Sequence, residues 1–114
     1  MPLPVSLNDY QSMAAMTAKP GLDMVYLTGK LTCEAGEASQ MALKHAYHGR
    51  PMDYDQLAAE LGDALWYIAV AARLMGLSLE SVAMLNFQKL QDRHGLSYNA
   101  AHYNATPQEG QCHQ

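Results

Sequence analysis

The chain has 114 residues, of which 49% are hydrophobic, and a formal net charge of −4 from 7 Lys and Arg against 11 Asp and Glu. This length is enough for one domain, the hydrophobic content excludes an intrinsically disordered protein, and the acidic balance argues against a surface that coats nucleic acid. Only 16% of the residues are charged, against roughly 25% in typical soluble domains. We therefore expect part of the surface to be covered by another copy of the chain.

No segment has the pattern of a targeting signal or a membrane span. The N-terminal residues have neither a basic region nor the long apolar run of a secretory signal. The most apolar stretch, residues 64–72, is far shorter than the ~20 residues that a membrane-spanning helix needs. The two cysteines have no framework spacing. These features predict a cytoplasmic protein with reduced thiols and no membrane partner.

Start and stop signals divide the chain into four helical segments, and strand signals are almost absent. Each segment follows a Ser or Asp that can accept hydrogen bonds from the first N–H groups of a helix, and each is followed by glycine or a Pro-Gly pair. The sequence therefore predicts an all-α fold. The expected helices span residues 7–19 after Ser6, 24–48 after Asp23, a third segment from Asp53 or Asp55 to about residue 75, and 79–94 after Ser78.

The third helix is the feature that most favours an oligomer. Between residues 61 and 77 its only formal charges are Asp63 and Arg73, so it is apolar nearly all round and should be enclosed by protein. The short connections predict an antiparallel, four-helix bundle-like domain, but three helices of so small a chain cannot enclose the fourth. We expect a homodimer or a dimer of dimers to complete the bundle.

The expected helical domain covers residues 1–95. Residues 96–114 are rich in Asn, Gln, Ala and Tyr and follow no helical period, so they are expected to form an extended arm or a disordered tail. The chain contains no internal repeat and no Gly-rich P-loop motif.

Two pairs of acidic residues lie on apolar faces of the second and third helices. Glu34 and Glu37 are spaced i, i+3 in line with an apolar stripe of the second helix, and Glu60 and Asp63 form a similar pair on the third. An ionised carboxylate removed from water must be paired or bind a metal. These acids are therefore either solvated surface groups or ligands of a divalent cation. Oxygen ligands without a thiolate favour Mg²⁺ or Mn²⁺.

Two other metal centres can be weighed. Di-iron bundles use a Glu-x-x-His pair, and neither Glu34 nor Glu60 is followed by His at that spacing, which excludes this centre. His45 and His48 are spaced i, i+3 and could bind zinc. They also occupy the last turn of the second helix, where the helix dipole favours histidine, and this structural role is the preferred interpretation.

The two acid pairs form an E-x-x-E motif and, after a 22-residue gap (residues 38 to 59), an E-x-x-D motif that continues into Trp66-Tyr67. Their order and spacing resemble the signature of the MazG-type all-α nucleoside triphosphate pyrophosphohydrolases. Cys33, directly before the first motif, departs from the Gly or Ala common there and is expected to be a small buried filler. Further similar segments are residues 7–11, 44–49, 76–82 and 86–93, so the resemblance covers about residues 6–95.

The resemblance implies a Mg²⁺-dependent enzyme that splits an NTP or dNTP between its α- and β-phosphates. The products are a nucleoside monophosphate and pyrophosphate, and the role is nucleotide-pool house-cleaning. In that family four acids hold the metal, so Glu34, Glu37, Glu60 and Asp63 are the implied ligands, with Mn²⁺ as a substitute ion. Glu34 and Glu37 are the implied catalytic carboxylates, and Glu37 is the candidate that orients or deprotonates the attacking water.

The resemblance also suggests that Asn86 and Lys89 contact the nucleotide, with a hydrogen-bonded core asparagine as the alternative for Asn86. Lys30 and Arg93 are further candidate contacts, because cations can neutralise phosphate oxygens. Tyr67 is a candidate for recognising the base. Three other aromatic residues share that candidacy, although a core or interface position is the preferred interpretation of the tryptophan: Trp66, Tyr10 and Phe87.

Two other functions stay open. Phosphoribosyl-ATP pyrophosphatase is a relative in the same superfamily and cleaves the same kind of bond. A catalytically idle helical dimer that binds nucleotides or a partner protein is an alternative of a different class. In each case the expected partner is a small-molecule nucleotide or a protein, and not a nucleic acid.

Overall fold

The computed structural model describes residues 6–95 and residue 98, and every regular element in that part of the chain is a helix. The all-α prediction is confirmed. The predicted tail lies outside the described residues, apart from residue 98. The helices are α1 (Leu7–Thr17), α2 (Met24–His48), α3 (Tyr54–Leu74) and α4 (Leu79–His94).

The ends of α2 and α3 follow from local capping. Helix α2 has the predicted bounds: the Asp23 side chain accepts a hydrogen bond at its start, and Gly49 ends it with a left-handed φ of 67°. Asp53, and not Asp55, caps α3, because its Oδ1 accepts a hydrogen bond from the Gln56 N–H at 3.0 Å. Local hydrogen bonding by short polar side chains thus sets these boundaries.

Helix α1 ends at Thr17, two residues before its predicted end. The residue that follows, Ala18, already has an extended backbone with φ −85° and ψ 130°. The pyrrolidine ring of Pro20 disfavours helical geometry at Lys19, so the helix has to end before that residue.

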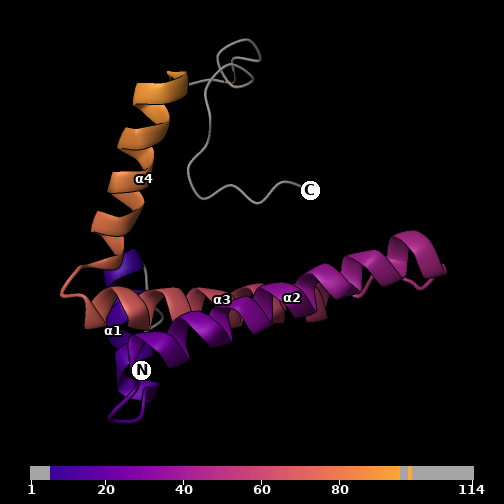
Figure 1. Cartoon of the computed structure of the whole chain (residues 1–114), viewed down its shortest axis with the longest axis horizontal. Coiled ribbons are helices and arrows are strands. Elements are labelled where there is room, and N and C mark those ends of the chain that lie inside the picture. The colour runs from indigo at the N-terminus through magenta and orange to yellow at the C-terminus, as the bar shows by residue number, and fades with distance from the viewer. Residues whose placement is uncertain (1–5, 96–97, 99–114) are drawn as a thin grey trace. The chain divides into compact units, whose positions relative to one another are not determined.

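The chain divides into two compact units, Met1–Glu80 and Ser81–Gln114. In the first unit α2 and α3 lie side by side, and α1 packs against α3 (Figure 1). Glu37 lies beside Glu60, whereas Tyr26 lies beside Tyr67, so later residues of α2 face earlier residues of α3 and the pair is antiparallel, as predicted. The buried core consists of Ala14, Leu27, Ala69, Val70 and Leu79.

The apolar stripe of α2 that is in line with Glu34, formed by residues 24, 27, 31, 38 and 41, faces α3. Leu27 is 1% exposed, and the other stripe residues, at positions 24, 31, 38 and 41, are half-buried. Cys33 is exposed, so the expectation that it is a buried filler is wrong. Adjacent residues of a helix are rotated by about 100°, so the side chain next to Glu34 points away from the face that packs on α3.

Helix α3 is only partly covered within the chain. Ala69 and Ala72 are fully buried, but Leu61, Leu65 and Leu74 remain 58%, 37% and 51% exposed. The expected apolar surface is therefore present on this helix, and its burial by a second copy stays a prediction.

The second unit contains α4 from Ser81 onward, and it too presents apolar side chains. Four of them are between 45% and 63% exposed: Met84, Leu85, Phe87 and Leu90. Among the described residues no single helix is long and apolar enough to cross a membrane. Helices α3 and α4 meet that criterion of length and composition only when they are counted together.

Candidate functional site

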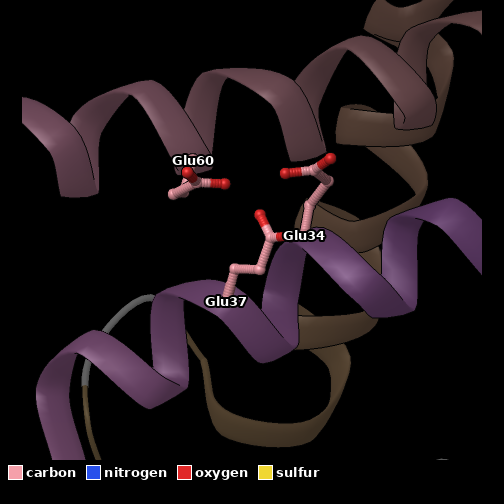
Figure 2. Close-up of side chains that lie close together, drawn as sticks. All are labelled: Glu34, Glu37 and Glu60. Atoms are coloured by element: carbon pink, nitrogen blue, oxygen red, sulfur yellow. The ribbon is translucent and has the colours of Figure 1, made fainter. Parts of the chain in front are cut away.

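Three of the four predicted acids meet where α2 packs on α3. Glu34 and Glu37 project from α2 and Glu60 from α3, and one carboxylate oxygen of each lies within 4.8 Å of the others (Figure 2). The i, i+3 spacing places the two α2 carboxylates on the face that packs on α3, as the sequence predicts. We call these three residues the glutamate cluster.

Two oxygen atoms of the glutamate cluster are buried without a hydrogen-bond donor of their own. These atoms are Oε2 of Glu34 and Oε2 of Glu60. Among the described residues no other group donates a hydrogen bond to either atom, so the only proton within reach is one that the carboxyl groups share. The other oxygen of Glu60 accepts a hydrogen bond from Nε2 of Gln56 at 2.8 Å. A buried anionic oxygen without a partner is costly, so these atoms call for a shared proton or a cation.

The proximity of the three carboxylates changes their acidity. The pKa of Glu34 is raised from 4.5 to about 7, first because its carboxyl group shares a hydrogen bond with Glu60, then because of desolvation and the charges of Glu37 and other nearby acids. The pKa of Glu37 is also raised, first by the hydrogen bond that Glu37 shares with Glu60 and then by the charge of Glu60. Hydrogen bonds from Glu37, Glu34 and Gln56 lower the pKa of Glu60. The cluster thus retains a proton near neutral pH, and Glu60 is its most acidic member.

The fourth predicted acid, Asp63, lies one turn beyond Glu60 on α3 and is exposed. Its carboxylate is not one of the three that lie within 4.8 Å of one another. Its negative charge nevertheless raises the pKa of Glu34, so it contributes to the same electrostatic field. The i, i+3 spacing does not by itself separate Asp63 from Glu60, because Glu34 and Glu37 have the same spacing and both belong to the cluster.

Lys30 and Tyr67, both predicted as substrate contacts, lie next to the glutamate cluster. The pKa of Tyr67 is raised mainly by burial and then by Tyr26, which forms a hydrogen bond with it, while the Lys30 charge lowers it and the Glu34 charge raises it. The Lys30 charge also lowers the pKa of Glu37. Tyr26 was missed by the sequence analysis, although its position one turn before Lys30 places it on the same face of α2.

Trp66 has a structural role in the described chain. Its ring meets that of Tyr67 edge to face, with centroids 5.0 Å apart and an interplanar angle of 86°. Its indole Nε1–H donates a hydrogen bond to Oγ1 of Thr17 at 2.8 Å, which joins α3 to the end of α1. The preferred core interpretation of this residue agrees with these contacts.

The remaining predicted contacts lie on the part of α4 that belongs to the second unit. Asn86 and Lys89 are exposed, Arg93 is half-buried, and their spacing places all three on one face of the helix. The exposure of Asn86 argues against the alternative of a core asparagine. Nucleotide binding by these three residues stays a prediction.

Comparison with known proteins identifies a domain family. The family model of the MazG nucleotide pyrophosphohydrolase domain matches residues 26–96, which include both acid motifs. The chain is 36% identical over 72 residues to the Gene 37 protein of Mycobacterium phage L5, and the alignment covers 60% of this chain and 63% of that protein. The chain thus spans less than two thirds of this relative, and no solved structure is significantly similar to it. The match over more than half of its length shows that the chain belongs to the MazG nucleotide pyrophosphohydrolase domain family.

Proposed function

We propose that the protein hydrolyses a nucleoside triphosphate, NTP or dNTP, between the α- and β-phosphates, and that it thereby clears nucleotides from the cellular pool. The proposal rests on one observation above all: three carboxylates converge at the α2–α3 contact, and two of their oxygens are buried without a donor of their own. Membership of the MazG family supports the same reaction class.

The glutamate cluster fits a hard divalent cation. Its donors are all carboxylate oxygens, the set that Mg²⁺ prefers and Mn²⁺ accepts, and the two buried oxygens lack the partner that a cation would supply. Glu34, Glu37 and Glu60 would hold the ion, and Asp63 would add its charge nearby. A bound cation would offset the carboxylate charge and withdraw electron density from the phosphate oxygens.

In this reaction water attacks the α-phosphorus and the bond from that phosphorus to the α,β-bridging oxygen breaks. The water proton goes to a carboxylate, and pyrophosphate leaves with the bridging oxygen. Glu37 is our candidate for the proton acceptor, because it is the exposed member of the cluster and a water molecule can reach its carboxylate. Lys30 and Tyr67 lie on the Glu34 side of the cluster and are our candidates for orienting the substrate.

A substrate panel tests this proposal. The full chain with Mg²⁺ or Mn²⁺ should release pyrophosphate from one or more members of a panel that contains the common NTPs and dNTPs, oxidised or otherwise damaged ones, and phosphoribosyl-ATP. Glu37→Gln should reduce kcat by at least about 100-fold. Asp55→Asn is the matched control, since it removes an exposed α3 carboxylate outside the glutamate cluster and should keep full activity.

The alternatives give different outcomes in the same panel. Turnover of phosphoribosyl-ATP alone would move the assignment to that relative. Nucleotide binding without hydrolysis of any member would instead support the catalytically idle dimer. Unchanged turnover by Glu37→Gln would refute the role of this residue.

A further inference from the structure

A second polar feature of the first unit lies at the C-terminal end of α2. A cavity of about 500 Å³ opens there, and it is lined by Gln40, Leu43, Lys44, His48 and Arg50. We call it the basic pocket, because two of its five lining residues carry a positive charge and none is acidic. A pocket of this size is large enough to accept a small ligand.

The two cations of the basic pocket have no carboxylate partner in the described part of the chain. Neither Lys44 nor Arg50 forms an ion pair with any described residue, although the protein has more acidic than basic side chains. Two unpaired cations that line one concave surface attract an anion, and phosphate is an anion that both Lys and Arg bind well.

The backbone that carries Arg50 is fixed before any ligand binds. The Arg50 N–H donates to the carbonyl of Lys44 at 3.3 Å, and Nδ1–H of His45 donates to the carbonyl of Arg50 at 2.8 Å. Gly49 makes the turn between them with its left-handed φ of 67°, a conformation that glycine adopts without strain. The wall of the pocket is therefore preorganised, and the His45 ring takes part in this turn.

The basic pocket lies along α2 from the glutamate cluster. Lys44 follows Glu37 by two helical turns, so the two residues share a face of α2 and their backbones are about 10 Å apart, with Gln40 one turn after Glu37. Side chains of a helix lean toward its N-terminus, so the long Lys44 side chain leans toward the cluster. An extended polyphosphate anchored at the cluster would point its far end at this pocket.

We propose that the basic pocket binds the terminal phosphates of the substrate, and then the pyrophosphate that is released. This inference rests on the proposed function. It assigns a direction to the bound nucleotide: the polyphosphate runs along α2 from the glutamate cluster to Lys44 and Arg50. The nucleoside lies on the opposite side of the cluster, near Lys30 and Tyr67. A nucleoside diphosphate is too short to engage the pocket fully, so the pocket favours the triphosphate over the diphosphate.

The first test measures binding without catalysis. Isothermal titration of inorganic triphosphate into the metal-free full chain is compared between the wild type and the Lys44→Gln/Arg50→Gln double variant. The double variant should bind at least about 10-fold more weakly, because it loses two charge-assisted contacts. The control is Lys19→Gln/Arg73→Gln, which removes the same charge from a different cavity of about 290 Å³. It should bind within about twofold of the wild type, since distant surface charges are screened.

The second test uses activity. For a nucleoside triphosphate the Lys44→Gln/Arg50→Gln variant should raise KM by about 10- to 100-fold. For the diphosphate of the same nucleoside its kcat/KM should stay within about threefold of the wild-type value, since that substrate does not reach the pocket. The single variant Lys44→Arg keeps the positive charge and should retain most of the wild-type affinity for the triphosphate. Circular dichroism confirms that each variant is folded.

The outcomes separate this inference from the proposed function. If the wild type hydrolyses a nucleoside triphosphate and both double variants hydrolyse it equally well, the proposed role of the basic pocket is overturned and the enzyme assignment stays intact. An equal loss of triphosphate binding in the Lys19→Gln/Arg73→Gln control would also overturn it, because general attraction of anions would then explain the result. If the wild type hydrolyses no nucleotide but only the Lys44→Gln/Arg50→Gln variant loses inorganic triphosphate, the pocket stands and the enzyme assignment fails.

Discussion

The side chain of Gln11 in α1 holds the backbone of Leu79 at the start of α4: its Oε1 accepts a hydrogen bond from the Leu79 N–H at 2.9 Å. Its Nε2 donates to the carbonyl oxygens of Leu77 and Ala69 at 3.0 and 3.1 Å. Gln11 is only 7% exposed, so these hydrogen bonds are largely shielded from water. One amide thus satisfies three backbone groups and joins α1 to the connection between α3 and α4.

Removing this amide should destabilise the fold strongly. Gln11→Leu keeps the volume of the side chain but leaves the Leu79 N–H and two carbonyl oxygens without their partner. We expect the free energy of unfolding to fall by about 3 kcal/mol, since each buried group left unsatisfied costs roughly 1–3 kcal/mol. Urea unfolding monitored by circular dichroism measures this change. Ser12→Ala, on the exposed side of the same helix, should change it by less than about 0.5 kcal/mol.

A charged analogue of the same residue sharpens this prediction. Gln11→Glu can still accept the Leu79 N–H but cannot donate to the two carbonyl oxygens while it is ionised. Its stability should therefore fall at neutral pH and recover in part on acidification, when the carboxyl group regains a proton to donate. If Gln11→Glu and Gln11→Leu were both as stable as the wild type, these bonds would not hold the two helices together.

Asn8 supplies a second, exposed contact to the same helix start. Its Oδ1 accepts the Glu80 N–H at 3.1 Å, and its Nδ2 donates to the Glu80 side chain at 3.0 Å. Asn8 therefore acts on α4 as an N-cap does, although it belongs to another helix. Asn8→Ala should lower the free energy of unfolding by about 1 kcal/mol, the usual cost of losing a cap. Asn8→Asp keeps the acceptor but places a carboxylate against that of Glu80, so the two variants are compared in a Glu80→Gln background, where Asn8→Asp should lose less than Asn8→Ala. Equal losses in that background would contradict the capping role.

The sequence was sufficient for the features that depend on local chemistry. The bounds of α2 follow from a cap residue and a glycine, and the i, i+3 spacing of Glu34 and Glu37 was enough to place both on the face that meets α3. The contacts of Gln11 and Asn8 join residues that are 58 to 72 positions apart, and no periodicity reveals such pairs. The divergence of Asp63 from the glutamate cluster depends on how α2 and α3 pack, which the spacing of residues within one helix does not determine.

Stability without metal should fall as the pH rises through neutrality. The pKa of Glu34 in the folded protein is about 7, against an ordinary value of 4.5, so the folded state holds a proton that the unfolded state releases. The stabilisation from this proton is complete below about pH 4.5 and is lost as the pH rises through about 7. We expect the Tm of the metal-free protein to decrease between pH 5 and pH 8, as measured by differential scanning fluorimetry with a chelator present.

The Glu34→Gln variant provides the control for this titration. Its amide cannot ionise, so its Tm should resemble that of the wild type at pH 5 and exceed it at pH 8. A wild-type Tm that rises between these two values while that of Glu34→Gln stays flat would show that the pKa of this carboxyl group is not raised.

Binding of Mg²⁺ should reverse the repulsion within the glutamate cluster. At a Mg²⁺ concentration about 100 times Kd, we expect the Tm at pH 8 to rise by roughly 10 °C. Glu60→Gln should abolish this rise, because it removes the carboxylate that both α2 glutamates face. Without metal, the same variant should be at least as stable as the wild type, since one like charge has been removed from the group.

Two comparisons make the metal prediction specific. Asp55→Asn removes one negative charge from α3 outside the glutamate cluster and should keep the full Mg²⁺ effect. Ca²⁺, which prefers more ligands at longer distances, should stabilise the protein less than Mg²⁺ or Mn²⁺. A Mg²⁺-induced rise that survives in Glu60→Gln would place the ion elsewhere.

The uncovered face of α3 predicts self-association. Leu61 and Leu65 are spaced i, i+4 and remain 58% and 37% exposed, and contiguous apolar surface of this kind usually marks an interface. Sedimentation velocity should give a mass of two or four chains at micromolar concentration. The Leu61→Lys/Leu65→Lys variant should shift the protein toward the monomer, because two charges would be buried without partners in the interface. Met16→Lys introduces a charge at a 72% exposed position of α1 and should leave the mass unchanged. A wild-type protein that sediments as one chain at all concentrations would mean that this apolar face is left to solvent.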